Sequence, residues 1–284
     1  MTELSDLLSV LELEPAGEGR FTARNFGDGP GLVVFGGQLL AQALVAGAQV
    51  DPSKDVKTIH TIFARSGALD QPLDVAVDVM HTGRAFASAT VSFSQGGKLC
   101  SRSLVLLSAQ EPDLIRHQPD RPAVDPPALG ASSAHGGDWW EIRTCGGADI
   151  NDPDAIGPAQ LDVWMRFPGA PGDVRTGQAL LAYASDGFLI GTAMRPHPGV
   201  GQALSHVTIS TTVLTHTLTF HEPFSAAEWV LVSHEAPYAG RGRSYGRAHV
   251  FTEDGRLVAS FVQDNMIRDF PQGQAPQPGE RSRH

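Results

Sequence analysis

The sequence matches itself three times, in the same order, along its 284 residues. The paired segments are GGQLLAQALVAG at 36–47 with TGQALLAYASDG at 176–187, TIHTIFA at 58–64 with LTHTLTF at 214–220, and GRAFASATVSFSQGGKLCSRSL at 83–104 with GRSYGRAHVFTEDGRLVASFVQ at 242–263. Their displacements of 140, 156 and 159 residues drift as small insertions would make them. Three matches in register predict two copies of one structural unit.

Each copy is predicted to contain a helix followed by strands. The first matched pair is rich in Ala and Leu, lacks proline, and is apolar nearly all round, which is typical of a helix buried in a core. The second pair alternates with β-branched residues, and the third has a strand, a glycine-containing turn and another strand. This order favours an α+β fold in which an antiparallel sheet wraps around one buried apolar helix.

The matches define the expected domain organisation. An N-terminal copy occupies 1–108, a proline-rich linker 109–157, a C-terminal copy 158–270 and a disordered tail 271–284. The prolines between 112 and 127 argue against regular structure in the linker. The pair Trp139 and Trp140 indicates that part of the linker packs on the body.

Composition narrows the class of protein. The formal net charge of −10 and the lack of a long basic block argue against a nucleic-acid partner. The two cysteines, Cys100 and Cys145, are too few for a disulfide framework, so we expect reduced thiols. No histidine or cysteine spacing suits a metal, and no cofactor is expected. No apolar stretch reaches the ~18 residues that a membrane span needs.

The N-terminal segment reads MTELSDLLSVLELEP and has neither a basic region nor a long apolar region. It therefore does not match a signal peptide, and we expect a cytoplasmic protein. Four leucines share one face of a short predicted helix that ends before Pro15: Leu4, Leu7, Leu8 and Leu11.

The pentapeptide GRSYG at 242–246 matches the Gly-x-Ser-x-Gly signature of a serine hydrolase. A nucleophile elbow requires a strand, a sharp turn and then a helix. Strand and turn residues follow Ser244 instead, and the other copy has Ala85 at the matching position. The copies share the glycine and arginine, not the serine, so a serine nucleophile is disfavoured.

Polar residues that occur in only one copy are candidates for chemistry. Ala46 matches Asp186, and Leu104 matches Gln263. An acid at the end of a nearly all-apolar helix is costly unless it is paired. Asp186 is thus a candidate functional group, with a turn residue before Gly187 as the alternative. His60 and His216 occur at matched positions in both copies, which indicates a structural role.

Four motifs are similar to those of the acyl-CoA thioesterase II family, the double hotdog thioesterases. They are VFGGQLLAQAL, LLAYASD, FHEPF with EWVL, and DGRLVASFVQDNMIR, and the similarity runs from about residue 5 to 270. The resemblance implies two tandem hotdog repeats and hydrolysis of acyl-CoA thioesters, a reaction of lipid metabolism. It also implies a catalytic Asp and Gln, which Asp186 and Gln263 match.

The catalytic hydroxyl of the family is not matched. The family has Thr/Ser-x-Asp-His, whereas this chain has Val213, Leu214, Thr215 and His216. Because side chains alternate along a strand, Thr215 and Thr211 are expected on the face of Val213, and Thr212 on the other. Thr215 is the first candidate for a relocated hydroxyl, and Thr211 is the alternative.

The expected mechanism is direct attack by water without a covalent intermediate. Asp186 would be the general base, with a pKa raised by burial, and Gln263 and a threonine would hold the water. Three arginines at strand entries are candidates for binding CoA phosphates, although surface arginines are as common: Arg84, Arg241 and Arg243.

Other functions remain as alternatives. The departure at Val213 leaves open a weakly active or non-catalytic acyl-CoA binding protein. Hydration or dehydration of acyl-CoA on a related fold would need a histidine soon after Asp186. The segment that follows, GFLIGTAMRP, contains no histidine, so this function is disfavoured. The two repeats in one chain already form the pair that a single hotdog repeat would obtain by dimerising. Further association into a homo-oligomer is left open.

Overall fold

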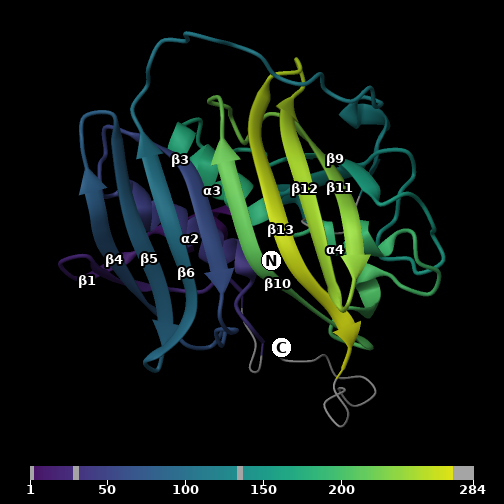
Figure 1. Ribbon diagram of the computed structural model, residues 1–284, viewed down its shortest axis with the longest axis horizontal. Coiled ribbons are helices and arrows are strands. Elements are labelled where there is room, and N and C mark those ends of the chain that lie inside the picture. Colours follow the sequence, from purple (N-terminus) through teal and green to yellow (C-terminus); the bar gives the residue numbers. More distant parts are fainter. Residues whose placement is uncertain (1–2, 28–31, 133–136, 271–284) are drawn as a thin grey trace.

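The computed structural model describes residues 3–27, 32–132 and 137–270 (Figure 1). In this part of the chain thirteen strands form one antiparallel sheet, with the helices packed behind it. The strands are β1 Glu14–Gly17, β2 Arg20–Ala23, β3 Asp55–Phe63, β4 Leu73–Thr82, β5 Phe86–Gln95, β6 Lys98–Ser108, β7 Ala131–Ser132, β8 Glu141–Thr144, β9 Gln160–Arg166, β10 Ile209–Phe220, β11 Val230–Gly240, β12 Arg243–Thr252 and β13 Leu257–Asp269. The helices are α1 Leu4–Leu11, α2 Gly36–Ala48, α3 Val174–Ala184 and α4 Leu189–Met194, with single 3₁₀ turns at Pro127–Leu129, Gly137–Trp139 and Gln202–Leu204.

The order of strands in the sheet shows the duplication. From the centre outward, one half runs β3, β6, β5, β4, β2 and the other runs β10, β13, β12, β11, β9. The halves meet where β3 pairs with β10, with Thr61 opposite His216. The predicted two copies are therefore confirmed, and each copy also contains strands that the sequence matches did not include, β2 and β4 in the first and β9 and β11 in the second.

The central helices α2 and α3 lie side by side against one face of the sheet (Figure 1). Their small and apolar residues allow this close packing, and nearly every residue of α2 is buried. At Gly37 an added Cβ would lie 2.2 Å from the carbonyl oxygen of Tyr183, so only glycine permits the contact between the two helices. The buried amide of Gln42 is satisfied by the carbonyls of Val10 and Arg24, at 2.8 and 2.7 Å.

The segment between the copies is more ordered than its prolines suggested. Residues 109–126 contain no helix or strand, as expected, but β8 joins the edge of the sheet through β9. This four-residue strand contains no proline, so its backbone can pair. The ring of Trp140 stacks on Phe167 at 5.6 Å, which confirms that part of the linker packs on the body. The predicted tail at 271–284 lies outside the described residues.

The N-terminal helix is present as α1, and Leu4, Leu7 and Leu11 are buried. Ser244 lies in β12 and is followed by the rest of that strand, a turn and β13, so the strand–turn–helix context of a nucleophile elbow is missing there. Within the described ranges, no helix is long and apolar enough to cross a membrane.

Candidate active site

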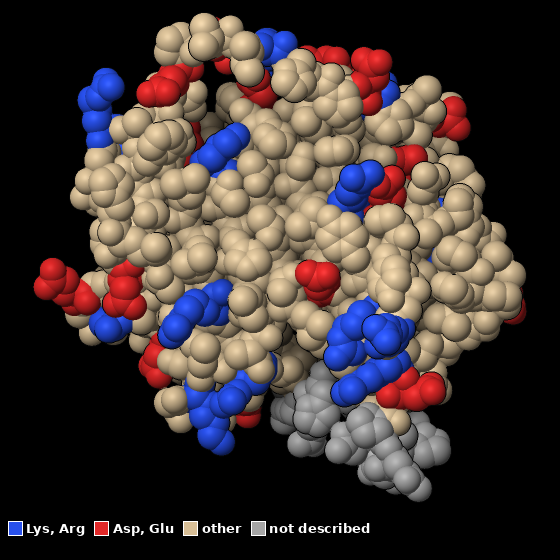
Figure 2. Space-filling view, viewed as in Figure 1, with Lys and Arg blue, Asp and Glu red and all other residues tan. Residues whose placement is uncertain are grey.

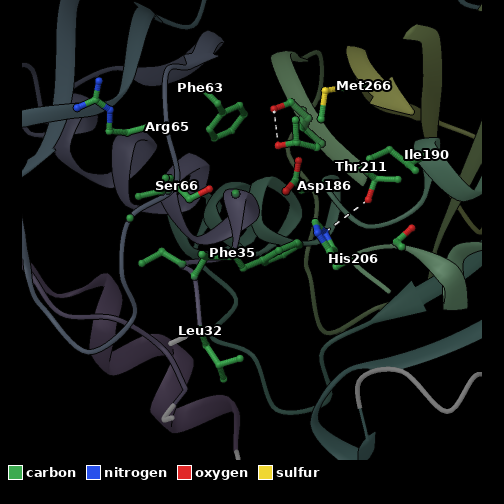
Figure 3. A pocket seen from close by; sticks show the side chains of 18 of the residues that line it. Leu32, Phe35, Phe63, Arg65, Ser66, Asp186, Ile190, His206, Thr211 and Met266 are labelled. Carbon is green, nitrogen blue, oxygen red and sulfur yellow. Dashed lines mark hydrogen bonds between the residues drawn. The ribbon is translucent and has the colours of Figure 1, made fainter. Parts of the chain in front are cut away.

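A pocket of about 1270 Å³ opens between the two copies and contains Asp186 (Figure 3). One wall comes from the N-terminal copy and is largely apolar, with Leu32, Phe35 and Phe63. The facing wall comes from the C-terminal copy and carries polar side chains, among them Gln202, Ser205, His206, Thr211 and Thr212. Asp186 lies between the walls in Figure 3. The pocket thus places one buried carboxyl group between an apolar and a polar surface.

Asp186 lies in the turn directly after α3, and its side chain is only 4% exposed. The N-terminus of α2, from the other copy, faces it: an added Cβ at Gly36 would lie 2.5 Å from Oδ2. Burial raises the pKa of Asp186 to about 7, and a hydrogen bond from the backbone N–H of Gly37 acts in the opposite direction. The expectation of a raised pKa agrees with this position.

Gln263 and His216 lie beneath the carboxyl group, and both are fully buried. Gln263 Nε2 donates to Asp186 Oδ1 at 3.1 Å and contacts His216 Nδ1 at 2.7 Å. His216 Nε2 is 3.1 Å from Ser185 Oγ. Gln263 does not line the pocket, so it contacts the carboxyl group rather than the space in front of it.

The expected position of Thr215 is wrong. A bulge at Leu214, between the register pairs Val213–Asn265 and Thr215–Asp264, turns the strand by one residue. Thr215 therefore faces the outer side of the sheet, where its Oγ1 donates to Asp264 Oδ2 at 2.9 Å. No local sequence pattern indicates the bulge, because the bulge depends on the pairing of β10 with β13.

Thr212, which was expected on the other face of the strand, lines the pocket together with Thr211, and the more buried of these two threonines is Thr211. Its side chain is buried and lines the same space as Asp186. Its Oγ1 is 3.5 Å from His206 Nε2, a contact drawn in Figure 3. Val213 also lines this pocket, so the position expected from the family is occupied by an apolar side chain.

At two polar positions the sequence match pairs residues that face opposite sides of the sheet, because the match is shifted by one residue from the true strand register. Leu104 is 49% exposed, whereas Gln263 is fully buried, so the two residues face opposite sides of the sheet. His60 is likewise only partly buried and bonds Thr217 Oγ1 at 2.7 Å, whereas His216 is fully buried. A shift of one residue reverses the face of a strand side chain. His216 therefore contacts the candidate site and His60 does not.

The three expected arginines do not lie together. Arg84 borders a smaller pocket of about 480 Å³ with Gln110 and Glu111. Arg241 and Arg243 are exposed at the turn from β11 to β12, and Arg243 is opposite Met266, which lines the main pocket. Figure 2 shows positive side chains gathered at this end of the sheet.

Arg65 lines the main pocket itself and was missed by the sequence reasoning (Figure 3). It lies two residues after the end of β3, and its backbone N–H bonds the carbonyl of Cys100 at 3.1 Å. Only its position after a matched strand could have drawn attention to it. In the described part of the chain, no group of three or more His, Cys, Asp or Glu side chains is arranged to hold a metal ion.

Solved structures with the same architecture define the class of fold. A hot dog protein from Alicyclobacillus acidocaldarius matches with a TM-score of 0.75 at 19% identity, over 93% of this chain and 98% of that one. A TesB protein from Mycobacterium avium subsp. paratuberculosis matches with a TM-score of 0.79 at 26% identity, over 93% and 99%. The fold is a double hotdog, as expected.

Sequence comparison identifies the family. The model of the acyl-CoA thioesterase N-terminal domain matches residues 27–108, and that of the C-terminal domain matches residues 115–267. Human acyl-coenzyme A thioesterase 8 is 30% identical over 93% of this chain and 89% of its own length. Acyl-CoA thioesterase 2 of Haemophilus influenzae is 30% identical over 83% and 87%. The chain belongs to the acyl-CoA thioesterase family.

Proposed function

We propose that the protein hydrolyses acyl-CoA thioesters to the free acid and CoA. The observation that carries the proposal is a nearly buried carboxyl group that lines a large pocket and whose pKa is raised by burial to about 7. A general base is most effective when its pKa lies near the working pH. Asp186 has this property because of its burial, and the family of the chain supplies the substrate class. The reaction would place the protein in lipid metabolism.

Asp186 Oδ2 is the atom that we assign as the base. Gln263 donates to Oδ1, and Oδ2 lies on the side of Gly36, which lines the pocket. Water held against Oδ2 would attack the thioester carbon while its proton passes to the carboxylate. The new C–O bond forms, the C–S bond breaks, and the proton on Asp186 passes to the departing thiolate. No covalent bond between acyl group and protein is needed.

The first turn of α2 is the proposed site of oxyanion stabilisation. The N–H groups in the first turn of a helix have no carbonyl partner within that helix, and they carry the positive end of its dipole. Gly37 already donates to Asp186, and Gly36 lines the pocket next to it. Backbone donors held in a water-poor site stabilise developing negative charge effectively.

The two walls of the pocket support an orientation of the substrate. The acyl chain is apolar, and we assign it to the side of Leu32, Phe35 and Phe63. The pantetheine arm carries amides and suits the polar wall around Gln202 and Thr211. The phosphates of CoA need cations at the mouth, and Arg65 together with Arg241 and Arg243 are the residues we assign to them.

Release of thiol from acyl-CoAs of graded chain length tests the proposal. The wild-type protein is expected to turn over part of this panel, and Asp186→Asn is expected to lose at least a hundredfold in kcat. Asp264→Asn is the matched control, because Asp264 is exposed on the outer face and should leave kcat unchanged. Binding without turnover at any chain length would contradict hydrolysis and favour the acyl-CoA binding protein that Val213 motivates.

A single turnover in oxygen-labelled water tests the absence of a covalent intermediate. Direct attack places the label in the released acid and leaves no acylated protein in an acid-quenched sample. An anhydride opened at its acyl carbon would also label the acid, but it would appear in that sample as protein heavier by one acyl group. Label found in the carboxyl group of Asp186 would show that an acyl anhydride had formed on the protein and would contradict direct attack.

A further inference from the structure

We infer that Ser185 and His216 act as positioning residues that fix which end of the Gln263 amide faces Asp186. The inference depends on the proposed function only for its effect on turnover. The contacts form a chain from the end of α3 to the carboxyl group: Ala182 O, Ser185 Oγ, His216, Gln263 and Asp186 Oδ1.

The first step is the tautomer of His216. Ser185 Oγ is 3.0 Å from the carbonyl oxygen of Ala182, which can only accept, whereas His216 Nε2 can donate, so we assign the single hydroxyl hydrogen to that carbonyl. Toward His216 Nε2, at 3.1 Å, the serine oxygen must then accept. Nε2 therefore carries the hydrogen of the neutral ring, and Nδ1 carries a lone pair.

His216 is neutral because of its surroundings. Its ring is fully buried and stacks on Phe261 at 5.4 Å. Burial lowers its pKa to about 3, and the charge of His60 acts in the same direction. The other titratable group facing it is Asp186, whose Oδ1 lies 3.9 Å from Nδ1. Nδ1 thus stays an acceptor at neutral pH.

The second step is the orientation of Gln263. Since His216 Nδ1 accepts at 2.7 Å, the nitrogen end of the amide must face it. The amide has two hydrogens, and the second reaches Asp186 Oδ1 at 3.1 Å. If the amide were turned around, its oxygen would face three acceptors at once, because the carbonyl oxygen of Ser185 also lies 3.4 Å from the present Nε2 position. The amide oxygen, Oε1, is buried and has no hydrogen-bond partner among the described residues. Because buried polar atoms are usually paired, this unpaired oxygen indicates that the two contacts of Nε2 determine the orientation of the amide.

The consequence concerns the charge of Asp186. A donor on Oδ1 favours the carboxylate over the acid and so limits the rise in pKa that burial causes. It also holds the carboxylate with Oδ2 toward the pocket. Removal of the serine hydroxyl would release the tautomer of His216, allow the amide to turn, and deprive Asp186 of this donor.

The direct test does not depend on turnover. In protein with nitrogen-labelled histidine, the spectrum of His216 is expected to show the neutral ring with hydrogen on Nε2. In protein with carbon-labelled aspartate, the pKa of Asp186 is expected to rise by about one unit in Ser185→Ala. Hydrogen on Nδ1, or an unchanged pKa in the variant, would overturn the inference even if the protein is an active thioesterase.

The kinetic test uses graded variants. Ser185→Ala is expected to lower kcat about tenfold with KM within about twofold, and to shift the pH profile by the same amount as the pKa. His216→Asn keeps an acceptor for Gln263 and should retain more activity than His216→Leu. His234→Asn is the matched control, because His234 is also buried but bonds Leu161 O instead. Equal losses of kcat in His216→Asn and His216→Leu, with equal melting temperatures, would contradict a positioning role.

Discussion

The carboxyl group of Asp186, from the C-terminal copy, lies against Gly36, from the N-terminal copy, so closely that an added Cβ would be 2.5 Å from Oδ2. The two residues are 150 positions apart in the sequence. The contact combines the two copies, since the C-terminal copy provides the acid and the N-terminal copy provides the N-terminus of the helix that faces it. The position in α2 that the sequence match pairs with Asp186 is occupied by Ala46, which has no carboxyl group.

Gly36→Ala tests this contact. The added methyl group would meet Asp186 Oδ2 at 2.5 Å and Phe63 Cζ at 3.4 Å, so the carboxylate must move. Misplacement of a catalytic group by about 1 Å can cost on the order of a hundredfold in rate, and we expect a loss of that size in kcat. Gly172→Ala is the control, because nothing lies within 4 Å of its added Cβ. Similar kcat values for both variants would argue against a role for the contact.

The pH dependence of kcat/KM reports the state of Asp186. Its pKa is raised to about 7, mainly by burial, and only the carboxylate can accept a proton from water. We therefore expect kcat/KM to fall tenfold per pH unit below about 7 and to level off above it. An inflection near pH 4 would show that the carboxyl group is solvated in the working enzyme.

The same raised pKa predicts that Asp186→Asn stabilises the protein at high pH. The folded pKa lies above the unfolded value, so wild-type Asp186 adds most to stability below pH 3.8 and loses that contribution as the pH rises through about 7. This difference in pKa corresponds to roughly 4 kcal/mol. Chemical denaturation should show a higher free energy of unfolding for the variant at pH 8, by up to about this amount, and little difference at pH 4. A pH-independent difference would refute the linkage.

The paired variants Thr211→Val and Thr215→Val distinguish the two threonines. Valine keeps the shape and removes the hydroxyl in both cases. Thr211 lines the pocket with Asp186, so its variant should lose about tenfold or more in kcat. Thr215 bonds Asp264 on the outer face, so its variant should keep wild-type kcat. The reverse pattern would show that the bulge at Leu214 is not present in solution.

The variants Arg65→Gln and Arg84→Gln compare an arginine that lines the main pocket with one that lines only the smaller pocket. If Arg65 contacts phosphates, its variant should raise KM for acyl-CoA about fivefold to twentyfold and leave KM unchanged for an acyl thioester of N-acetylcysteamine, which has no phosphate. Arg84→Gln should change KM less than twofold with either substrate. A rise with both substrates would assign Arg65 to the acyl or thioester part instead.

The sequence alone determined the duplication, the α+β class and the position of the acid. The self-matches carry the fold because each repeats a helix or strand pattern that local physics decides. Asp186 was identifiable because a carboxyl group at the end of an apolar helix usually has either a chemical role or a role in a turn.

Only the tertiary structure decided which side chains meet Asp186. The bulge at Leu214 moved Thr215 to the outer face, and a phase difference of one residue had hidden that His60 and His216 face opposite sides. Gly36 and Arg65 reach the site from the other copy through contacts between distant segments. Strand register and helix packing are set by pairing across the sheet rather than by local sequence, and one residue of register reverses every side chain of a strand.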